Sequence, residues 1–284
     1  PLSEEQWNQQ FELYKQSPEF QQVNSHFEIN DYKKIFFWEY LHRLWGRLIF
    51  FVSFFAGLIF VYRKKIELHV VLIASTLVAL QGLIGWLMVK SGLNQDPLVS
   101  PYLLVIHFLS ANVVLLYLYF QFKKLQEKII LKNFIGRTKK IFYALGGVIV
   151  LQVIYGGLVS GFRAGHSFNT WPLMGGDFFP MGGLRMSPVI LNFFENPAAI
   201  QWTHRWLAFS LILLIILFSR SIGSEKVKIK NQIRHMHATV GLQIILGILN
   251  IIFAVPIFLA AAHQLVAVFI IMGYANILFK VQNE

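Results

Sequence analysis

The chain has 284 residues, of which 56% are hydrophobic and only 14% are charged, and its formal net charge is +11. Soluble domains carry about one-quarter charged residues, so this composition excludes an ordinary soluble protein and is typical of a membrane protein. The sequence contains no cysteine, which excludes disulfides, thiolate metal sites and a cysteine nucleophile.

Residues 1–35 form a polar segment with several acidic side chains and no recognisable cleavable signal peptide. We expect this segment to be partly helical and to lie on the outer side of the membrane. A chain that starts outside without an export signal predicts a preceding membrane-spanning helix, so we expect the first transmembrane helix to be missing from this sequence.

Seven apolar windows follow the polar segment. About 20 apolar residues suffice for a helix to cross a bilayer. Because hydrocarbon offers no hydrogen-bond partners, the backbone of such windows must pair within helices. The sequence therefore predicts an all-α polytopic membrane protein, with spans near residues 38–62, 67–89, 102–122, 141–162, 199–220, 236–254 and 257–279.

Basic residues gather after alternate windows, at 63–65, 123–140 and 220–234, with Lys280 close to the C-terminus. Acidic residues concentrate in the segments on the opposite side. By the positive-inside rule, the basic segments face the cytoplasm or the mitochondrial matrix. The positive net charge is thus a signal of topology, and we expect no nucleic-acid partner.

The two halves of the chain resemble each other. His204 lies 162 positions after His42, and a deletion of six residues in the following loop matches His107 with His263. The pattern predicts two tandem four-helix bundles, with seven of the eight helices present, related by a pseudo-twofold axis along the membrane normal. The expected parts are an outer polar segment (1–35), an N-terminal half-bundle (36–122), a basic inner linker (123–140) and a C-terminal four-helix bundle (141–284).

These four histidines lie inside predicted spans, near one side of the membrane, two in each half. Two opposed neutral imidazoles suit the axial positions of a haem iron, whereas zinc usually takes four close ligands and fits less well. The alternative is that each histidine hydrogen-bonds a neighbouring helix. The repetition of the pair favours ligation.

One difference breaks the symmetry. Glu39 lies three residues before His42, on the same helical face, whereas Gln201 lies three residues before His204. The carboxylate either pairs with a nearby arginine such as Arg43 or handles a proton beside a reacting substrate. A single carboxylate in two similar sites predicts one substrate site and one cofactor site.

An arginine follows one histidine of each pair, Arg43 in the first half and Arg205 in the second. Guanidinium groups bind carboxylates in bidentate fashion, so these arginines are candidates for the haem propionates. Anchoring in the lipid headgroup layer is the alternative for both. The Gly- and Pro-rich loop 161–180 is predicted to cover one of the two sites.

Several long motifs occur in an order that resembles one family, the haem A synthases. They are EYLHRLWGRLI, AGHSFNTWPLMGGDFFP, NFFENPAAIQWTHRWLA and AAAHQLVA. The resemblance covers the whole chain and implies an eight-helix protein. The absence of cysteine is similar to the proteobacterial and mitochondrial branch.

The resemblance implies an oxidoreductase that converts haem O to haem A by oxidising the C8 methyl group to a formyl group, for cytochrome oxidase assembly. It implies haem b bound by His204 and His263, haem O near His42 and His107, and Glu39 as the essential carboxylate. The membrane would be the bacterial inner membrane, or the mitochondrial inner membrane in a eukaryote.

Candidate partners implied by the resemblance are haem O as substrate, membrane lipid, haem O synthase, an electron-transfer protein and a second copy of the chain. The alternative function is a dihaem b-type electron carrier linked to quinol. Transfer of electrons across a bilayer needs haems near both faces, whereas all four histidines lie near one, which favours the synthase.

Overall fold

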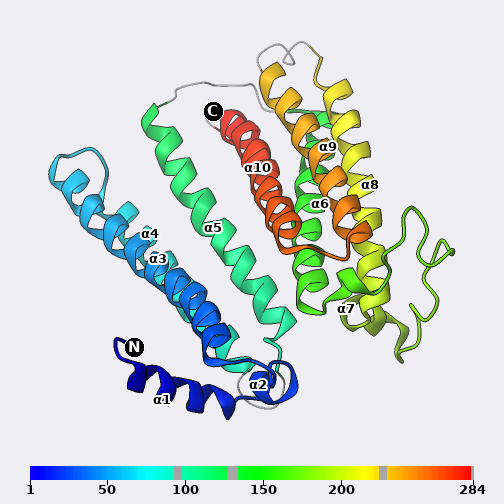
Figure 1. Ribbon diagram of the computed structural model, residues 1–284. Helices are drawn as coiled ribbons and strands as arrows, with labels where there is room; N and C mark the ends of the chain where they lie inside the picture. Colours follow the sequence, from blue (N-terminus) through cyan, green and yellow to red (C-terminus); the bar gives the residue numbers. More distant parts are fainter. Residues whose placement is uncertain (93–96, 127–133, 224–228, 283–284) are drawn as a thin grey trace. The chain divides into compact units, whose positions relative to one another are not determined.

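A computed structural model of the chain describes residues 1–92, 97–126, 134–223 and 229–282 (Figure 1). Two parts of the predicted basic segments, residues 127–133 and 224–228, lie outside the described residues. Asp96, an acidic residue of a predicted outer segment, also lies outside them. Within the described part, the elements are all helices, with only one isolated bridge between Met174 and Asp177.

All seven predicted spans are confirmed as helices that are long and apolar enough to cross a membrane. The chain is therefore a multi-pass α-helical membrane protein. The helices are α3 (Ile29–Tyr62), α4 (Leu68–Ser91), α5 (Pro101–Gln126), α6 (Gly136–Gly161), α8 (Pro197–Ser221), α9 (Lys230–Ile252) and α10 (Ile257–Gln282).

The first long helix begins earlier than the sequence predicts, at Ile29 instead of near residue 38. Its start is capped, because the backbone N–H of Glu28 donates to the carboxylate of Asp31. Helix α1 (Glu4–Lys15), with the short α2 (Pro18–Gln22) after it, packs on this extra length. The rings of Tyr14 and Tyr32 stack with centroids 4.8 Å apart, so aromatic contacts extend α3 beyond its membrane-spanning part.

Prolines set the starts of three helices that carry candidate ligands. Pro101 and Pro197 are the first residues of α5 and α8, and Pro256 immediately precedes α10. Proline fits the first turn because the N–H that it lacks would have no partner there. At α8 the side chain of Asn196 also accepts from the N–H of Ala198 at 3.0 Å. These starts place the histidines of all three helices in the second turn.

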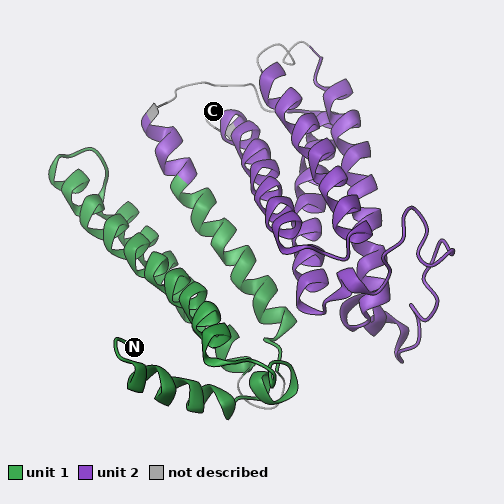
Figure 2. Cartoon of the chain, in the orientation of Figure 1, with its two compact units in different colours: residues 1–118 green, residues 119–284 purple. Residues whose placement is uncertain are grey.

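The chain divides into two compact units, Pro1–Leu118 and Tyr119–Glu284, coloured separately in Figure 2. The boundary falls inside α5, a few residues before the predicted end of the N-terminal half at residue 122. Unit 1 holds α1 to α4 and most of α5; unit 2 holds the remaining spans. The bundle symmetry expected from the repeat stays a prediction.

The two units differ in how much of their helices is covered. In α3 only 6% of the most apolar window is buried within the protein, whereas in α6 the share is 28%. Unit 2 has an aromatic core, where the ring of Phe142 stacks on that of Tyr274 at 4.6 Å and also packs against Phe218 at 5.2 Å. Unit 2 therefore holds its helices with more internal packing than unit 1.

The segment between α6 and α8 is an ordered loop with short helical turns, η1 (Ala164–His166), η2 (Val189–Leu191) and α7 (Asn192–Glu195). Asn192 is fully buried and organises the loop. Its side-chain oxygen accepts from the N–H of Met186, and its amide donates to the carbonyls of Met186 and Val189. These hydrogen bonds fix the conformation of the loop just before α8 begins.

Candidate functional sites in the two units

In unit 2, α8 and α10 bring the rings of His204 and His263 close together in an edge-to-face arrangement. Their ring centroids lie 6.5 Å apart, and the ring planes make an angle of 66°. The Nδ1 atoms of both rings are buried and have no hydrogen-bond partner. A buried polar atom without a partner needs an explanation, and two such atoms on opposed rings indicate a site for a ligand.

In unit 1, α3 and α5 bring His42 and His107 together in nearly the same way. The ring centroids lie 6.3 Å apart with an angle of 69° between the planes. His42 is exposed, whereas His107 is half-buried. The structure therefore brings together both histidine pairs that the repeat predicts.

The spacing of both pairs fits a metal ion between the two rings. A bond from a metal to an imidazole nitrogen is about 2 Å long, and that nitrogen lies roughly 1 Å from the ring centroid. One iron atom between two imidazoles therefore sets the centroids about 6 Å apart. Across the described ranges, no cluster of three or more His, Cys, Asp or Glu could hold a metal ion, so each pair supplies two protein ligands of these types.

The arginine beside each pair is in a different environment. Arg205 is 7% exposed, and its two terminal nitrogens donate to the carbonyls of Thr170 and Phe168, both at 3.0 Å. Its Nε is buried without a partner, and no carboxylate within the described ranges pairs with it. The guanidinium also lies over the ring of Trp171, 5.8 Å from its centroid. A buried positive charge without a carboxylate partner favours a nearby anionic group.

Gln201, the counterpart of Glu39, also hydrogen-bonds the loop. It is 2% exposed, and its amide donates to the carbonyl of Phe168 at 3.2 Å. Trp202 donates to the carbonyl of Phe178 at 3.0 Å. Residues on both sides of His204 thus fasten the loop after α6, and the loop that the sequence predicts to cover one site lies over the site of unit 2.

The carboxylate of unit 1 is on the surface. Glu39 accepts from a terminal nitrogen of Arg43 at 3.1 Å, and the two side chains are 54% and 45% exposed. The observed pair is one of the two alternatives that the sequence leaves open for Glu39. An exposed ion pair of this kind contributes little to stability, so the Glu39 carboxylate can exchange partners.

Sequence reasoning missed the residues that lie beneath the histidine rings. The amide of Gln152 on α6 donates to the backbone carbonyl of His204 at 3.2 Å, and the amide of Gln81 on α4 donates to the carbonyl of His107 at 2.9 Å. The signal was present, since glutamine followed four residues later by glycine occurs at 81, 152 and 243, but only the contacts show its relation to the histidines.

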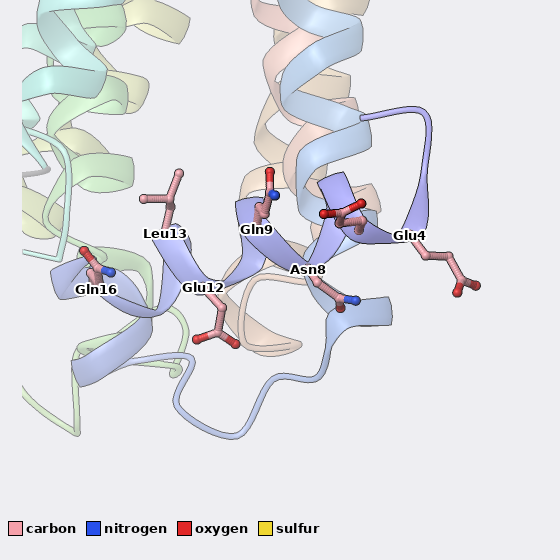
Figure 3. Close-up of a pocket in the computed structure, with 7 residues that line it drawn as sticks. Glu4, Asn8, Gln9, Glu12, Leu13 and Gln16 are labelled. Atoms are coloured by element: carbon pink, nitrogen blue, oxygen red, sulfur yellow. The ribbon is translucent and has the colours of Figure 1, made fainter.

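A surface hollow lies on helix α1. It has a volume of about 850 Å³ and runs along one face of α1, as the close-up in Figure 3 shows. Polar and acidic side chains line it, with Leu13 as the apolar exception. None of the predicted site residues lines this hollow, so it does not belong to either candidate site. The other lining residues are Glu4, Glu5, Asn8, Gln9, Glu12 and Gln16.

A family model described as cytochrome oxidase assembly protein, COX15-CtaA, matches residues 1–274. The chain belongs to this family. Among its relatives, a Heme A synthase of Bartonella henselae is 34% identical over 95% of this chain and 77% of the relative. A Heme A synthase of a Wolbachia from Brugia malayi is 36% identical over 96% of this chain and 81% of the relative.

The similarity extends to a eukaryotic protein. Heme A synthase COX15 of Saccharomyces cerevisiae is 35% identical over 93% of this chain and 63% of the relative. The family membership confirms the resemblance drawn from the sequence motifs. It agrees with a protein that has two histidine pairs within membrane-spanning helices.

Proposed function

We propose that this protein converts haem O to haem A in the membrane, for cytochrome oxidase assembly. The observation that carries the proposal is the opposed pair His204 and His263, whose spacing of 6.5 Å fits an iron between the rings. The names of the relatives and the second pair in unit 1 support it. Replacement of a methyl group by a formyl group is an oxidation, so the protein must hold the substrate beside a redox centre.

In this proposal unit 2 holds haem b. His204 and His263 would hold it through their imidazoles, and haem b when bound would supply a one-electron redox centre. The buried guanidinium of Arg205 would face a propionate, which would supply the missing negative charge. The loop fastened by Arg205, Gln201 and Trp202 would exclude water from this side of the cofactor.

Unit 1 would hold the substrate haem O near His42 and His107. Exposed side chains suit a site that must take in one porphyrin and release another. Arg43 would bind a propionate of the substrate, which frees Glu39 from the ion pair that it forms in the structure. Glu39 would then be the group that accepts a proton when the methyl group is oxidised.

Pigment analysis of the protein purified from membranes tests the proposal. Haem b at one equivalent, with smaller amounts of haem O or haem A, is the expected composition. Two equivalents of haem b without haem O or haem A would instead favour the dihaem electron carrier. Formation of haem A from added haem O in membranes that hold the protein gives the direct test of activity.

The partners follow from the chemistry of the proposed reaction. The substrate is an apolar porphyrin, so it would arrive through the lipid or directly from haem O synthase. With water as the source of the oxygen atom, oxidation of the methyl group to a formyl group releases four electrons and four protons, and the electrons would leave through an electron-transfer partner. A second copy of the chain is a further candidate partner.

A further inference from the structure

We propose that three Gln-x-x-x-Gly segments are positioning elements that set the orientation of three of the four candidate haem ligands. The segments are Gln81–Gly85 on α4, Gln152–Gly156 on α6 and Gln243–Gly247 on α9. This spacing occurs nowhere else in the sequence. The inference rests on the proposed function, in which these histidines bind iron.

The glycine of each segment lies directly against an imidazole ring. A Cβ atom added at Gly85 would lie 2.8 Å from Cε1 of His107. The same addition at Gly156 would lie 3.3 Å from Cε1 of His204, and at Gly247 it would lie 3.2 Å from Cε1 of His263. All three rings therefore present the same edge to a glycine on a neighbouring helix, and any larger residue would push the ring away.

The glutamine lies one helical turn before the glycine and on the same face. In unit 1 the amide of Gln81 donates to the backbone carbonyl of His107 at 2.9 Å and lies 3.1 Å from Nδ1 of its ring. In unit 2 the amide of Gln152 donates to the carbonyl of His204 and lies 3.4 Å from Nε2 of its ring. The glutamine thus ties the histidine backbone and ring to the neighbouring helix.

The three glutamines differ in whether the side-chain oxygen accepts a hydrogen bond. The side-chain oxygen of Gln81 accepts from the hydroxyl of Ser110. The corresponding oxygens of Gln152 and Gln243 are buried and have no partner. A histidine that gives one nitrogen to a metal carries its proton on the other nitrogen, and that N–H usually donates to an oxygen. The free glutamine oxygens of unit 2 are acceptors of this kind, placed beside the ligands expected for haem b.

The chain itself offers matched controls. Each of the three helices has a second glycine at which an added Cβ would meet nothing within 4 Å: Gly82 on α4, Gly147 on α6 and Gly241 on α9. Alanine at either glycine of a helix gives a similar gain in helix propensity. A difference between the two variants therefore reports the contact with the histidine.

The test uses the full-length protein purified with its haem b. We expect the double variant Gly156→Ala/Gly247→Ala to lose haem b to apomyoglobin about tenfold faster than wild type, which equals about 1.4 kcal/mol and is the usual size of an overpacking effect. Its low-spin electron paramagnetic resonance signal should also shift. The control Gly147→Ala/Gly241→Ala should match wild type in both measurements. Equal behaviour of the two double variants would overturn the proposal.

Gln152→Leu tests the glutamine separately. Loss of the acceptor should shift the low-spin signal while haem b stays bound, and Gln152→Glu, which keeps an oxygen at this position, should move the signal back. A Gln152→Leu spectrum superimposable on that of wild type would remove the glutamine from the proposal.

His204→Ala in the same assay tests the assignment of the haem ligands separately from the positioning role of the Gln-x-x-x-Gly segments. If His204→Ala keeps its haem b, the ligand assignment of the proposed function is wrong. If His204→Ala loses haem b while the glycine pairs behave alike, only the positioning role is wrong.

Discussion

The two histidine pairs have nearly the same geometry but lie in opposite environments. The centroid separations are 6.3 Å in unit 1 and 6.5 Å in unit 2. In unit 2 the flanking Gln201 and Arg205 are buried under a fastened loop, whereas in unit 1 Glu39 and Arg43 form an exposed ion pair. In the proposed function, this contrast separates a site that holds a cofactor from a site that exchanges a substrate.

The difference is a matter of what surrounds the ligands. Burial and fixed hydrogen bonds hold a group in place and slow its release, while exposure permits exchange. Among the described residues, Glu39 is the carboxylate that lies beside a histidine pair, and it belongs to unit 1. The proposed function places the chemistry in unit 1 and the redox centre in unit 2, and the following variants test that division.

The largest effect is expected for Glu39→Gln, which makes unit 1 resemble unit 2 at this position. Because a positioned acid or base contributes about 10²–10⁴-fold to a rate, haem A formation should fall by at least about a hundredfold. Bound haem b should be unchanged. Product is measured by chromatography of extracted haems, with Glu12→Gln on α1 as a control that removes a carboxylate elsewhere. Normal haem A formation by Glu39→Gln would remove this residue from the mechanism.

A similarly large but different effect is expected for His204→Ala or His263→Ala. Loss of an axial ligand should deplete haem b to a small fraction of the wild-type content, because the remaining imidazole alone holds the iron weakly. The pyridine haemochrome spectrum per polypeptide measures this content. His237→Ala is the control, since that ring bonds the carbonyl of Ile233 within its own helix. Normal haem b in both test variants would move the cofactor out of unit 2.

A moderate effect is expected for Arg205→Leu. The variant removes two charge-assisted hydrogen bonds to the loop, each worth about 1.5–3 kcal/mol, and leaves two carbonyls without these donors. The loop should become sensitive to proteases near residues 168–171, and haem b should dissociate faster. Limited proteolysis followed by mass spectrometry locates the cleavage. An intact loop in this variant would show that Gln201 and Trp202 suffice to hold it.

The smallest effect on stability is expected for Arg43→Leu, the matching change in unit 1. Exposed ion pairs contribute about 0–1 kcal/mol, so the temperature of thermal aggregation should stay close to that of wild type. Substrate affinity should fall instead, because the variant removes the group expected to bind a propionate. A loss of stability as large as that of Arg205→Leu would contradict the contrast between the two units.

The amino-acid sequence determined the seven spans and the pairing of the histidines within each half. The similar depth of His107, His204 and His263 in the membrane stays a prediction. Long apolar windows form helices in a bilayer because their backbone groups can hydrogen-bond only within the protein. Prolines at helix starts then set the positions of the histidines along their helices. The start of α3 differed most, and α6 and α9 also begin several residues earlier than predicted. For α3 the reason is that the aromatic contacts of Tyr32 with α1 join segments distant in the sequence.

Only the tertiary structure decided which site the loop after α6 covers, what Arg205 bonds to, and that a glutamine or a glycine lies beneath three of the imidazoles. Hydrophobic periodicity reports whether a residue can lie in a membrane helix, but it carries no information on which neighbouring helix each face meets. Those partners depend on the rotation and packing of helices against one another. The physical limit is that a local pattern specifies a helix, whereas a site needs contacts between helices.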